Sequence, residues 1–515
     1  MKRASKTKCA TAAMALAWTG SAALAAPVDR GWPSYNNDLL GQRFSPLKEI
    51  NKGNVGTLKT VCSIKVQEGG SFQASPVVVD GVMYITTARD TIAMDPTTCA
   101  EKWRHKFISA DEDVFANNRG VAIDNGRIFR GTATGAFFAL DLAGKPLWSV
   151  QIGNPVIGEF VAAAPIAWGG LVFQAVAGSD WGVRGRVMAY DAATGREVWR
   201  FNTVPTGDEV GADTWKNKNS VLTGGGGVWT TLTLDASTGE LFIPVGNPAP
   251  DLDASYRPGD NLFTDAVVSL DARTGKLLWY HQHIKNDSID HDMSAAPVVF
   301  RDPNVRDILV YAGKDGMLTA LDRSTKAVIY STPVTTVDNN GAAATEAGAH
   351  VCPGLLGGVE WNGPAYDPKA NMLFVGSVDW CTNFKKGKPK YIQGELFFGG
   401  DPVMDAKHNG GWITAVEAST GAVKWKYHTE APVVGGITPT AGNVVFGGDT
   451  SGKFFAFDSE NGKVLYTLPT PGMIAGGVVT YSVKGKQYVA LTSGNVSRIT
   501  FGELGDPSVY ILALP

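Results

Sequence analysis

The sequence has few of the features that mark membrane, haem, zinc or nucleic-acid-binding proteins. Beyond the N-terminal segment, no stretch approaches the about 18 uninterrupted apolar residues of a membrane-spanning helix. Cysteine is scarce, with 5 in 515 residues, and neither a CxxCH haem motif nor a CxxC zinc spacing occurs. Lysine and arginine (46) do not outnumber aspartate and glutamate (49), which argues against a nucleic-acid-binding surface. We therefore expect a soluble protein with no membrane span and no covalent haem.

Residues 1–25 have the pattern of a secretory signal peptide. Four basic residues precede an alanine-rich apolar run and the small-residue site Ala23-Leu24-Ala25. We expect cleavage after Ala25 and export of residues 26–515. Loss of four positive charges leaves 42 basic against 49 acidic residues, a net charge of −7. A mildly acidic surface would suit a basic partner protein.

Four cysteines remain after the signal peptide: Cys62, Cys99, Cys352 and Cys381. In an oxidising compartment these can close two loops. Pairing neighbours in the sequence predicts one disulfide between Cys62 and Cys99 and another between Cys352 and Cys381.

A pattern of apolar residue, acid, turn and aromatic residue recurs seven times. An aromatic residue follows the acid by eight positions, or by seven at Trp148. Each copy predicts a hairpin in which one strand ends at the acid and the next carries the aromatic residue. The copies are AMDPTTCAEKW from Ala93, ALDLAGKPLW from Ala139, AYDAATGREVW from Ala189, SLDARTGKLLW from Ser269, ALDRSTKAVIY from Ala320, AVEASTGAVKW from Ala415 and AFDSENGKVLY from Ala456.

The spacing of these copies predicts an all-β, eight-bladed β-propeller of four-stranded antiparallel blades. A hairpin pair every 40 to 50 residues or so is the period of a propeller blade. Seven motifs plus one blade closed by strands from both chain ends give eight, in a single domain over 26–515. The wide gaps 191–271 and 322–417 would hold insertions or degenerate strands. We expect the repeated Trp residues to pack between blades.

One segment that interrupts the repeats is NDSIDHDM, residues 286–293, which follows an apparent strand. It contains three aspartates and a histidine. Because carboxylates this close repel one another, they are stable together only in open solvent, or where a cation or a proton-transfer reaction holds them.

From WPSYNNDLLGQRFSPLKEINKGNVGTL to GKQYVALTSG, the chain resembles the pyrroloquinoline-quinone (PQQ) dependent alcohol dehydrogenases. The segments GGVEWNGPAY and RPGDNLFTDAVVSLDARTGKLLW are specific signals. The resemblance is closest to the polyvinyl-alcohol and sugar or sorbose dehydrogenase branch, and weaker to methanol dehydrogenase. The repeats alone would not exclude a non-catalytic scaffold propeller.

The resemblance implies a set of cofactor-binding residues. Trp229 in GGGGVW would form the aromatic floor under PQQ, and the glycines would let the backbone approach closely. Arg119 in NNRG would bind a cofactor carboxylate, since a guanidinium can donate two hydrogen bonds. Lys314 in AGKDG would reach the quinone oxygens. The resemblance also assigns Gly178, Glu360 and Trp361 to the cofactor site.

The resemblance also implies a metal site and a base. Its ligands would be Asp180, Asn247 and Asp290, whose oxygen atoms suit Ca²⁺. Asp290 would be the catalytic base. Asp292, expected on the same side if the stretch is extended, would add the ligand typical of lanthanide-dependent methanol dehydrogenases. Asp180 departs from the glutamate of the methanol-oxidising enzymes.

Two alternatives concern the same acidic segment. Asp287 is interpreted as a solvated loop acid. A zinc site formed by His281, His283 and His291 is a further possibility, although it lacks a supporting cysteine or HExxH motif.

Other departures indicate that the substrate pocket is not a methanol pocket. The segment ADEDVFANN lacks the adjacent cysteines that cover the cofactor in methanol dehydrogenases. Glu360 replaces an asparagine that bonds the quinone, so it would have to be protonated or point elsewhere. The separation of Cys352 and Cys381 matches a family disulfide.

The resemblance implies a periplasmic PQQ-dependent dehydrogenase that oxidises a secondary alcohol to the ketone. Asp290 would take the hydroxyl proton during metal-assisted hydride transfer to PQQ. The substrate would be polyvinyl alcohol, a sugar, or a bulky hydroxylated compound such as a trichothecene mycotoxin. A separate cytochrome c or other acceptor would receive the electrons. The alternatives are a lanthanide-dependent dehydrogenase of small primary alcohols and a non-enzymatic periplasmic propeller scaffold.

Overall fold

The computed structural model describes Met1, residues 29–497 and residues 500–515, so the predicted signal peptide lies almost wholly outside the described residues. Strands dominate, and none of the described helices is long and apolar enough to cross a membrane. The helical segments are single turns of 3₁₀-helix: η1 (Val55–Thr57), η2 (Pro155–Ile157), η3 (Ser179–Trp181), η4 (Ala212–Thr214), η5 (Val221–Thr223) and η6 (Ala254–Tyr256).

The described strands form eight four-stranded antiparallel sheets, in agreement with the predicted propeller of four-stranded blades. The first four are β2 (Val77–Val79), β3 (Val82–Thr86), β4 (Asp90–Met94) and β5 (Glu101–Lys106); β6 (Ala122–Asp124), β7 (Arg127–Gly131), β8 (Ala136–Asp141) and β9 (Pro146–Gln151); β10 (Ile166–Trp168), β11 (Leu171–Val176), β12 (Arg186–Asp191) and β13 (Glu197–Asn202); and β14 (Thr233–Asp235), β15 (Glu240–Val245), β16 (Ala266–Asp271) and β17 (Leu277–Gln282).

The other four sheets continue along the chain. They are β18 (Val298–Arg301), β19 (Asp307–Ala312), β20 (Met317–Asp322) and β21 (Val328–Pro333); β23 (Ala365–Asp367), β24 (Met372–Val378), β27 (Gly411–Glu417) and β28 (Val423–Thr429); β29 (Thr438–Pro439), β30 (Val444–Gly448), β31 (Lys453–Asp458) and β32 (Val464–Pro469); and β33 (Val478–Val483), β34 (Lys486–Ser493), β35 (Ser508–Ala513) and β1 (Lys59–Lys65).

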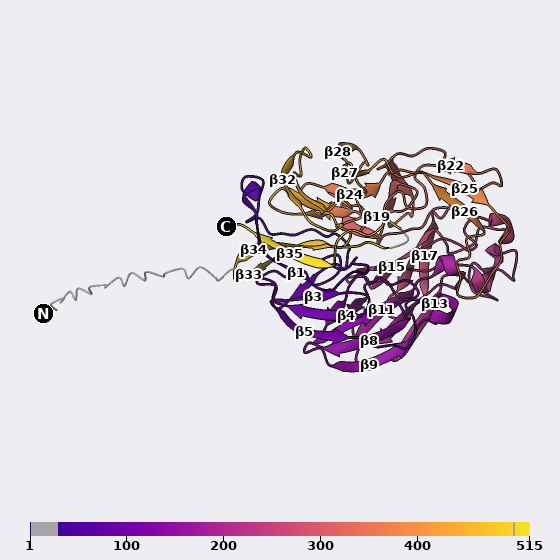
Figure 1. Cartoon of the computed structure of the whole chain (residues 1–515), viewed down its shortest axis with the longest axis horizontal. Helices are drawn as coiled ribbons and strands as arrows, with labels where there is room; N and C mark the ends of the chain where they lie inside the picture. The colour runs from indigo at the N-terminus through magenta and orange to yellow at the C-terminus, as the bar shows by residue number, and fades with distance from the viewer. Residues whose placement is uncertain (2–28, 498–499) are drawn as a thin grey trace.

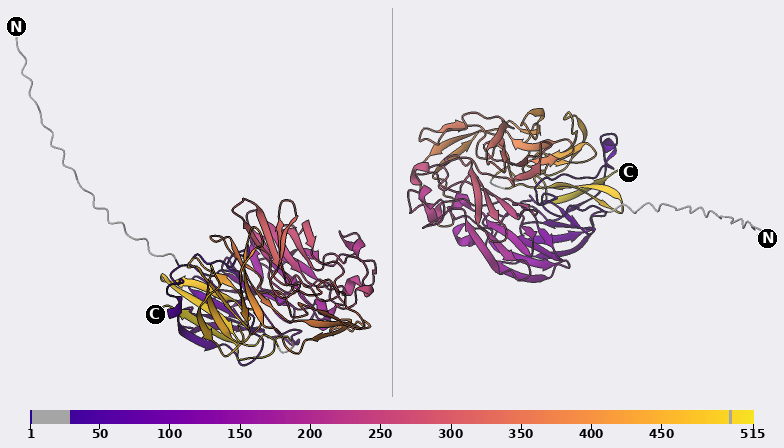
Figure 2. Two further views of the ribbon diagram at one scale, coloured as in Figure 1. Left: turned by 90° about the horizontal axis from the view of Figure 1, so that it is seen from above. Right: turned by 180° about the vertical axis from the view of Figure 1, so that it is seen from behind.

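The last sheet closes the ring with strands from both ends of the chain, as predicted. Strand β1 pairs antiparallel with β35, from Lys59 opposite Ala513 to Lys65 opposite Ser508. Figures 1 and 2 show the indigo and yellow parts of the chain side by side after the colours have passed around the molecule. Closure of this kind leaves no open edge between the first and last blades.

Within each blade, the fourth strand is the least buried. First strands of several successive blades contact one another, for example β6 with β10 and β18 with β23. The fourth strands alternate between exposed and half-buried residues, as in β5. The core therefore lies between neighbouring sheets, with the first strands at the centre of the ring.

The repeated aromatic residues pack between blades, as predicted. Trp199 on β13 donates its indole hydrogen to the Ala272 carbonyl of the next blade at 2.9 Å. Its ring covers Gly275, where an added Cβ would lie 2.6 Å from the ring. The same pairing of indole and glycine recurs at Trp103 and Gly144, Trp148 and Gly195, and Trp425 and Gly462.

Both wide gaps in the repeat hold insertions. Residues 203–232, with η4 and η5, separate β13 from β14. The second gap contains a three-stranded sheet of β22 (Ala349–Val351), β25 (Thr382–Lys386) and β26 (Gly400–Met404). This sheet lies at the side of the molecule away from the termini (Figure 1).

Both predicted disulfides are confirmed. The Cys62–Cys99 bond ties the closing strand β1 to the turn before β5. The Cys352–Cys381 bond joins the inserted sheet to the residues that follow β24.

Candidate functional site

The predicted site residues converge on one cavity of about 310 Å³. Asn247 is the exception. It adjoins the cavity through Asp292, whose Oδ1 accepts a hydrogen bond from the backbone amide of Asn247 at 2.7 Å. The cavity is lined by the predicted residues Arg119, Gly178, Asp180, Trp229, Asp290, Asp292, Lys314, Glu360 and Trp361, together with Gln73, Phe115, Asn117, Phe160, Ala162, Ser179, Trp181, Leu355, Leu356, Leu396, Phe398, Met404, Thr500 and Phe501.

The glycine run before Trp229 brings the backbone close to Asn247. Gly226 donates its amide to the Asn247 carbonyl at 2.8 Å. Gly225 has a φ of +81°, and an added Cβ would lie 2.6 Å from the same carbonyl oxygen. Only glycine tolerates both conditions. The sequence GGGGVW thus sets the indole of Trp229 and the side chain of Asn247 at neighbouring positions.

Arg119 lies against two of the tryptophans that line the cavity. Its Nη1 donates to the Trp229 carbonyl at 2.8 Å, and its Cζ lies 4.9 Å from the Trp229 ring and 5.0 Å from the Trp361 ring. Burial lowers the pKa of Arg119 to about 10, so the guanidinium is charged at neutral pH. Its buried Nε has no protein partner. Such a group fits a ligand carboxylate.

Lys314 connects two of the predicted aspartates. Its Nζ lies 2.8 Å from Asp290 Oδ2 and 2.8 Å from Asp292 Oδ2. Although burial lowers the pKa of Lys314, the acidic neighbours Asp290 and Asp292 raise it well above its ordinary value. The stretch is not extended, since Asn286 and Asp290 have φ values of 50° and 60°, so the condition for Asp292 to share a side with Asp290 by strand alternation is not met. Asp290 and Asp292 meet through Lys314 instead of by strand alternation.

Three carboxylates lie close together beside the cavity: Asp180, Asp251 and Asp290. One oxygen from each lies within 4.8 Å of the others. Burial raises the pKa of Asp180 to about 6 and the pKa values of Asp251 and Asp290 well above their ordinary range. These acids therefore resist ionising together without a cation.

Several buried atoms of this cluster and of Asn247 have no hydrogen-bond partner in the protein. They are Asp290 Oδ1, both carboxylate oxygens of Asp251, and the side-chain oxygen and nitrogen of Asn247. Buried polar atoms in a folded protein are normally bonded, so these orphaned oxygens indicate an absent ligand. A set made of carboxylate and amide oxygens fits a hard cation such as Ca²⁺ or a lanthanide ion.

Sequence reasoning missed Asp251. It lies four residues after Asn247 in the segment VGNPAPD, and is fully buried. The resemblance assigned no role to it, and its spacing carries no periodic signal. Its presence in a segment already assigned to the site was the one available clue.

Glu360 was expected to be protonated or to point away from the quinone, and its surroundings agree with the protonated form. It is 4% exposed, and its Oε1 has no protein partner. Burial raises the pKa of Glu360 to about 7, so the protonated form is well populated near neutral pH. The neighbouring Trp361 is held by a hydrogen bond from its indole to the Ala475 carbonyl at 2.8 Å.

Asp287 is not a solvated acid, so that interpretation was wrong. It is 4% exposed, and its carboxylate accepts hydrogen bonds from the amides of Ile289 at 3.2 Å and His291 at 3.0 Å. The tight turn of the segment supplies these amides, which compensate for burial of the charge.

The three histidines do not form a metal site. His283 is engaged by Tyr311 at Nδ1 and by Asp315 at Nε2, at 2.9 and 2.7 Å. Within residues 29–497 and 500–515, the only other cluster of possible metal ligands is His350 with Cys352 and Cys381, whose sulfurs are bonded to each other.

The cover of the cavity is apolar and comes largely from inserted segments. Phe115, from the segment that lacks adjacent cysteines, contacts the rings of Phe160 and Trp181. Leu355 and Met404 lie near the inserted sheet, and both line the cavity. This cover favours an apolar ligand surface beside the charged floor.

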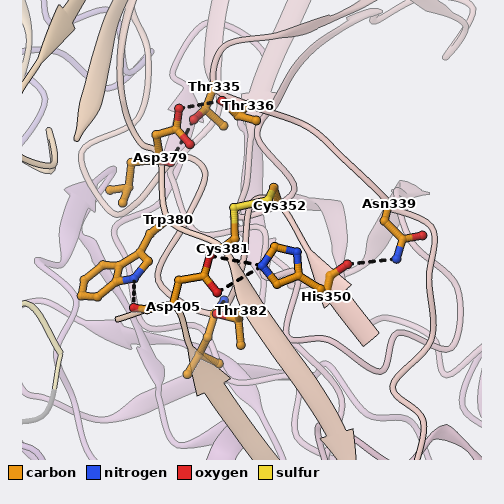
Figure 3. Close-up of a disulfide and its surroundings, with 12 residues drawn as sticks. Thr335, Thr336, Asn339, His350, Cys352, Asp379, Trp380, Cys381, Thr382 and Asp405 are labelled. Atoms are coloured by element: carbon orange, nitrogen blue, oxygen red, sulfur yellow. Dashed lines mark hydrogen bonds and ion pairs between the residues drawn. A yellow bond between two sulfur atoms is a disulfide. The ribbon is translucent and has the colours of Figure 1, made fainter. Parts of the chain in front are cut away.

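The Cys352–Cys381 disulfide fixes this cover (Figure 3). Around it, the indole of Trp380 donates to the Asp405 carbonyl at 2.9 Å, and His350 pairs with the Asp405 carboxylate at 3.1 Å. The Leu355 amide donates to the Thr382 hydroxyl at 3.1 Å. The disulfide therefore anchors the segment that carries Leu355 to β25.

Comparison with known proteins places these features in a family. The model of the PQQ family described as "Glucose/ethanol/alcohol dehydrogenase, beta-propeller domain" matches residues 32–347 and 426–489. The dehydrogenase subunit of "Alcohol dehydrogenase (quinone)" from Acetobacter aceti is 31% identical over 93% of this chain and 73% of its own length. "Putative dehydrogenase XoxF" from Paracoccus denitrificans is 28% identical over 94% of this chain and 91% of its own.

Solved structures agree with the sequence comparisons. A "Europium-containing methanol dehydrogenase" has a TM-score of 0.87 at 26% identity, covering 94% of this chain and 98% of its own. The quinohemoprotein alcohol dehydrogenase from Comamonas testosteroni has a TM-score of 0.84 at 26% identity, covering 94% and 80%. The chain therefore belongs to the PQQ-dependent alcohol dehydrogenases, oxidoreductases that act on CH–OH groups and bind a metal ion with PQQ.

Proposed function

We propose that this chain is a periplasmic dehydrogenase that oxidises a secondary alcohol on a bulky, largely apolar compound to the ketone. The observation that carries this proposal is the apolar cover of the cavity, formed by Phe115, Leu355, Leu396, Phe398 and Phe501 above a charged floor. A polycyclic alcohol such as a trichothecene fits such a cover better than a sugar or the densely hydroxylated polyvinyl alcohol does. A sugar would need many more polar partners.

The residues of the floor suit PQQ and a metal ion. The aromatic face of Trp229, the free Nε of Arg119 and the orphaned oxygens of Asn247 and Asp290 match a flat tricarboxylate and a hard cation. Bound PQQ would accept the hydride, with the metal polarising its reactive carbonyl.

The chain itself would handle the proton and the orientation of the substrate. Asp290 would accept the hydroxyl proton, while Lys314 holds Oδ2 of this carboxylate. The indole of Trp229 supports the flat cofactor from one side. The apolar cover excludes water from the reacting centre.

The proposal includes export and a separate electron acceptor. A signal peptide at 1–25 would direct residues 26–515 to the periplasm as one propeller domain. Two disulfides support an oxidising compartment. No CxxCH motif occurs in these 515 residues, so electrons would pass to a separate cytochrome c or other acceptor.

A second candidate is a lanthanide-dependent dehydrogenase of small primary alcohols. The likeness to a europium-containing methanol dehydrogenase and to XoxF supports it, as does the carboxylate cluster. The apolar cover argues against it, because a small primary alcohol would contact little of that surface.

A scaffold role has weaker support. BamB from Moraxella catarrhalis has a TM-score of 0.52 at 16% identity, a likeness of fold alone. A scaffold would have no use for a buried cluster of orphaned carboxylate and amide oxygens.

The test is a substrate panel with the full chain, reconstituted with PQQ and either Ca²⁺ or La³⁺, using an artificial dye as acceptor. We expect higher kcat/KM for bulky secondary alcohols than for methanol and ethanol. Higher values for the small primary alcohols would favour the second candidate. Absence of dye reduction and of any rise in melting temperature with PQQ would contradict both.

A further inference from the structure

Asp251 differs from the other acids of the cavity in having no protein partner at all. It is fully buried, and neither of its carboxylate oxygens has a hydrogen-bond partner. A buried carboxylate normally accepts several hydrogen bonds or pairs with a cation. Within the described part of the chain, Asp251 instead directs an oxygen to within 4.8 Å of ligand oxygens from Asp180 and Asp290.

A buried arginine holds the Asp251 segment in place without a hydrogen bond to the Asp251 carboxylate. Arg257 donates to the Pro250 carbonyl at 3.0 Å and to the Asp251 carbonyl at 3.2 Å. The same guanidinium donates to the Asp287 carbonyl. Arg257 therefore joins the segment of Asp251 to the segment of Asp290. Its remaining hydrogen bonds go to the side-chain oxygens of Asn261 and Asn286. The Asp251 carboxylate remains available.

Asp292, by contrast, has both oxygens engaged. Its Oδ1 accepts a hydrogen bond from the backbone amide of Asn247 at 2.7 Å, and its Oδ2 lies 2.8 Å from Lys314 Nζ. Asp292 thus orients the backbone of one ligand residue and the lysine that holds Asp290. It is a positioning residue in this arrangement, although the sequence pattern had placed it among the ligands.

We propose that Asp251 is a direct metal ligand, and that with Asp180 and Asp290 it completes a three-carboxylate set that selects a trivalent cation over Ca²⁺. Asn247 supplies an amide oxygen to the same ion. When the carboxylates ionise around a bound cation, the four aspartates, including Asp292, and Lys314 carry a formal charge of −3. Attraction to a cation scales with its charge, so a trivalent ion gains more than a divalent one from each carboxylate.

This proposal rests on the metal-assisted chemistry of the proposed function, and its test does not depend on turnover. The full chain, stripped of metal, is titrated with Tb³⁺ in the absence and presence of PQQ, with luminescence sensitised by the tryptophans of the cavity as the readout. Calorimetric titration with Ca²⁺ gives the divalent affinity. Wild type is compared with Asp251→Asn, Asp292→Asn and Asp265→Asn.

Asp265→Asn is the matched control. Asp265 is also fully buried with both carboxylate oxygens unpartnered, yet it is outside the ligand cluster. The two variants therefore make the same isosteric change from acid to amide at equally buried positions. They differ in how close the position lies to the other ligands.

We expect Asp251→Asn to weaken Tb³⁺ binding by at least about 10-fold and Ca²⁺ binding by a smaller factor. Asp292→Asn should have a smaller effect on Tb³⁺, and Asp265→Asn close to none. Asp251→Ser, which shortens the side chain, provides a second variant for the same titration.

Wild-type Tb³⁺ affinity in both Asp251 variants would overturn the inference, as would an equal loss in Asp265→Asn. The proposed function would survive those outcomes, because the wild-type chain would still bind its ion. Failure of the wild-type chain to bind either Tb³⁺ or Ca²⁺, with or without PQQ, would contradict the metal-assisted function as well.

Discussion

At the scale of single residues, Asp290 combines an unusual backbone conformation with a buried, unpartnered carboxylate oxygen. Its φ of 60° is a left-handed conformation that non-glycine residues seldom adopt, and such conformations concentrate at functional sites. The turn directs Oδ2 to Lys314 and leaves Oδ1 free. Burial raises the pKa of Asp290, which strengthens it as a base, while Lys314 opposes that shift.

Asp290→Asn should lower kcat by about 10²- to 10⁴-fold, because the amide keeps the shape and an oxygen but accepts no proton. PQQ affinity should change far less, since Trp229 and Arg119 are untouched. The measurement is dye-linked turnover together with PQQ titration.

The control for this variant is Asp260→Asn, in a loop where Asp260 forms an exposed ion pair with Lys285 at 2.7 Å. Its activity should stay close to wild type, as surface ion pairs contribute little. Asp287 is unsuitable as a control because it is buried and hydrogen-bonded. An active Asp290→Asn enzyme would place the base elsewhere.

Glu360 should make the stability of the metal-free and PQQ-free protein depend on pH. Burial raises its pKa from 4.5 to about 7, so the folded state keeps a proton that the unfolded state releases. Its contribution to stability is fully present below pH 4.5 and is lost as the pH rises through about 7. Relative to Glu360→Gln, the wild-type free energy of unfolding should fall by about 3 kcal/mol over this range.

Chemical denaturation at a series of pH values measures this difference. The exposed Glu346→Gln variant should give a curve parallel to wild type. If the wild-type and Glu360→Gln curves also run parallel, the burial of Glu360 does not set its protonation.

At the scale of elements, the repeated hairpin turn and the tryptophan of the preceding blade form one unit. The blade from β18 to β21 shows what this unit requires. There Lys326 takes the place of the turn glycine with a φ of 65°, and its Nζ lies 4.3 Å above the Trp279 ring. A cation–π contact thus replaces the direct packing of glycine on the indole.

Gly275→Ala tests the packing of this unit. The added Cβ would lie 2.6 Å from the Trp199 ring at a φ of +70°. Gly81→Ala is the matched control, since Gly81 has a φ of +72° and nothing within 4 Å of an added Cβ. Both variants carry the cost of a left-handed alanine, about 1–2 kcal/mol. Gly275→Ala should lower the free energy of unfolding by about a further 1–3 kcal/mol through overpacking.

Chemical denaturation of the two variants gives this difference directly. Equal losses would mean that the indole yields without cost, and that the contact between blades contributes little to stability.

At the scale of the whole molecule, the two disulfides have different tasks. Cys62–Cys99 joins the closing strand β1 to the first blade and therefore constrains the ring. Cys352–Cys381 anchors the segment of Leu355 over the cavity. One bond concerns closure of the fold, and the other concerns the substrate side of the site.

Replacing Cys62 and Cys99 together by serine should lower the free energy of unfolding by about 2–4 kcal/mol, as expected for a loop with a sequence separation of 37. Well below the melting temperature, kcat/KM should stay near the wild-type value. Replacing Cys352 and Cys381 should instead raise KM for bulky alcohols. Denaturation and steady-state kinetics of both double variants measure this contrast, and identical kinetic behaviour would contradict the assigned tasks.

The amino-acid sequence by itself determined the all-β propeller, the closure by both chain ends and both disulfide pairs. The propeller and its closure depend on local hairpins repeated along the chain, and a period is visible without knowledge of contacts. The disulfide pairs followed from pairing cysteines that are neighbours in the sequence. The motif resemblance also brought Arg119, Trp229, Asp290 and Lys314 to one site.

Only the tertiary structure decided how the acids of that site divide their roles. Asp251 joins the ligand cluster because Arg257 clamps two loops that are distant in the sequence. Asp292 turns to Lys314 and Asp287 to its own turn amides because left-handed residues break the alternation that a strand would impose. Side-chain direction in irregular loops depends on contacts between blades, and neither composition nor spacing encodes those contacts.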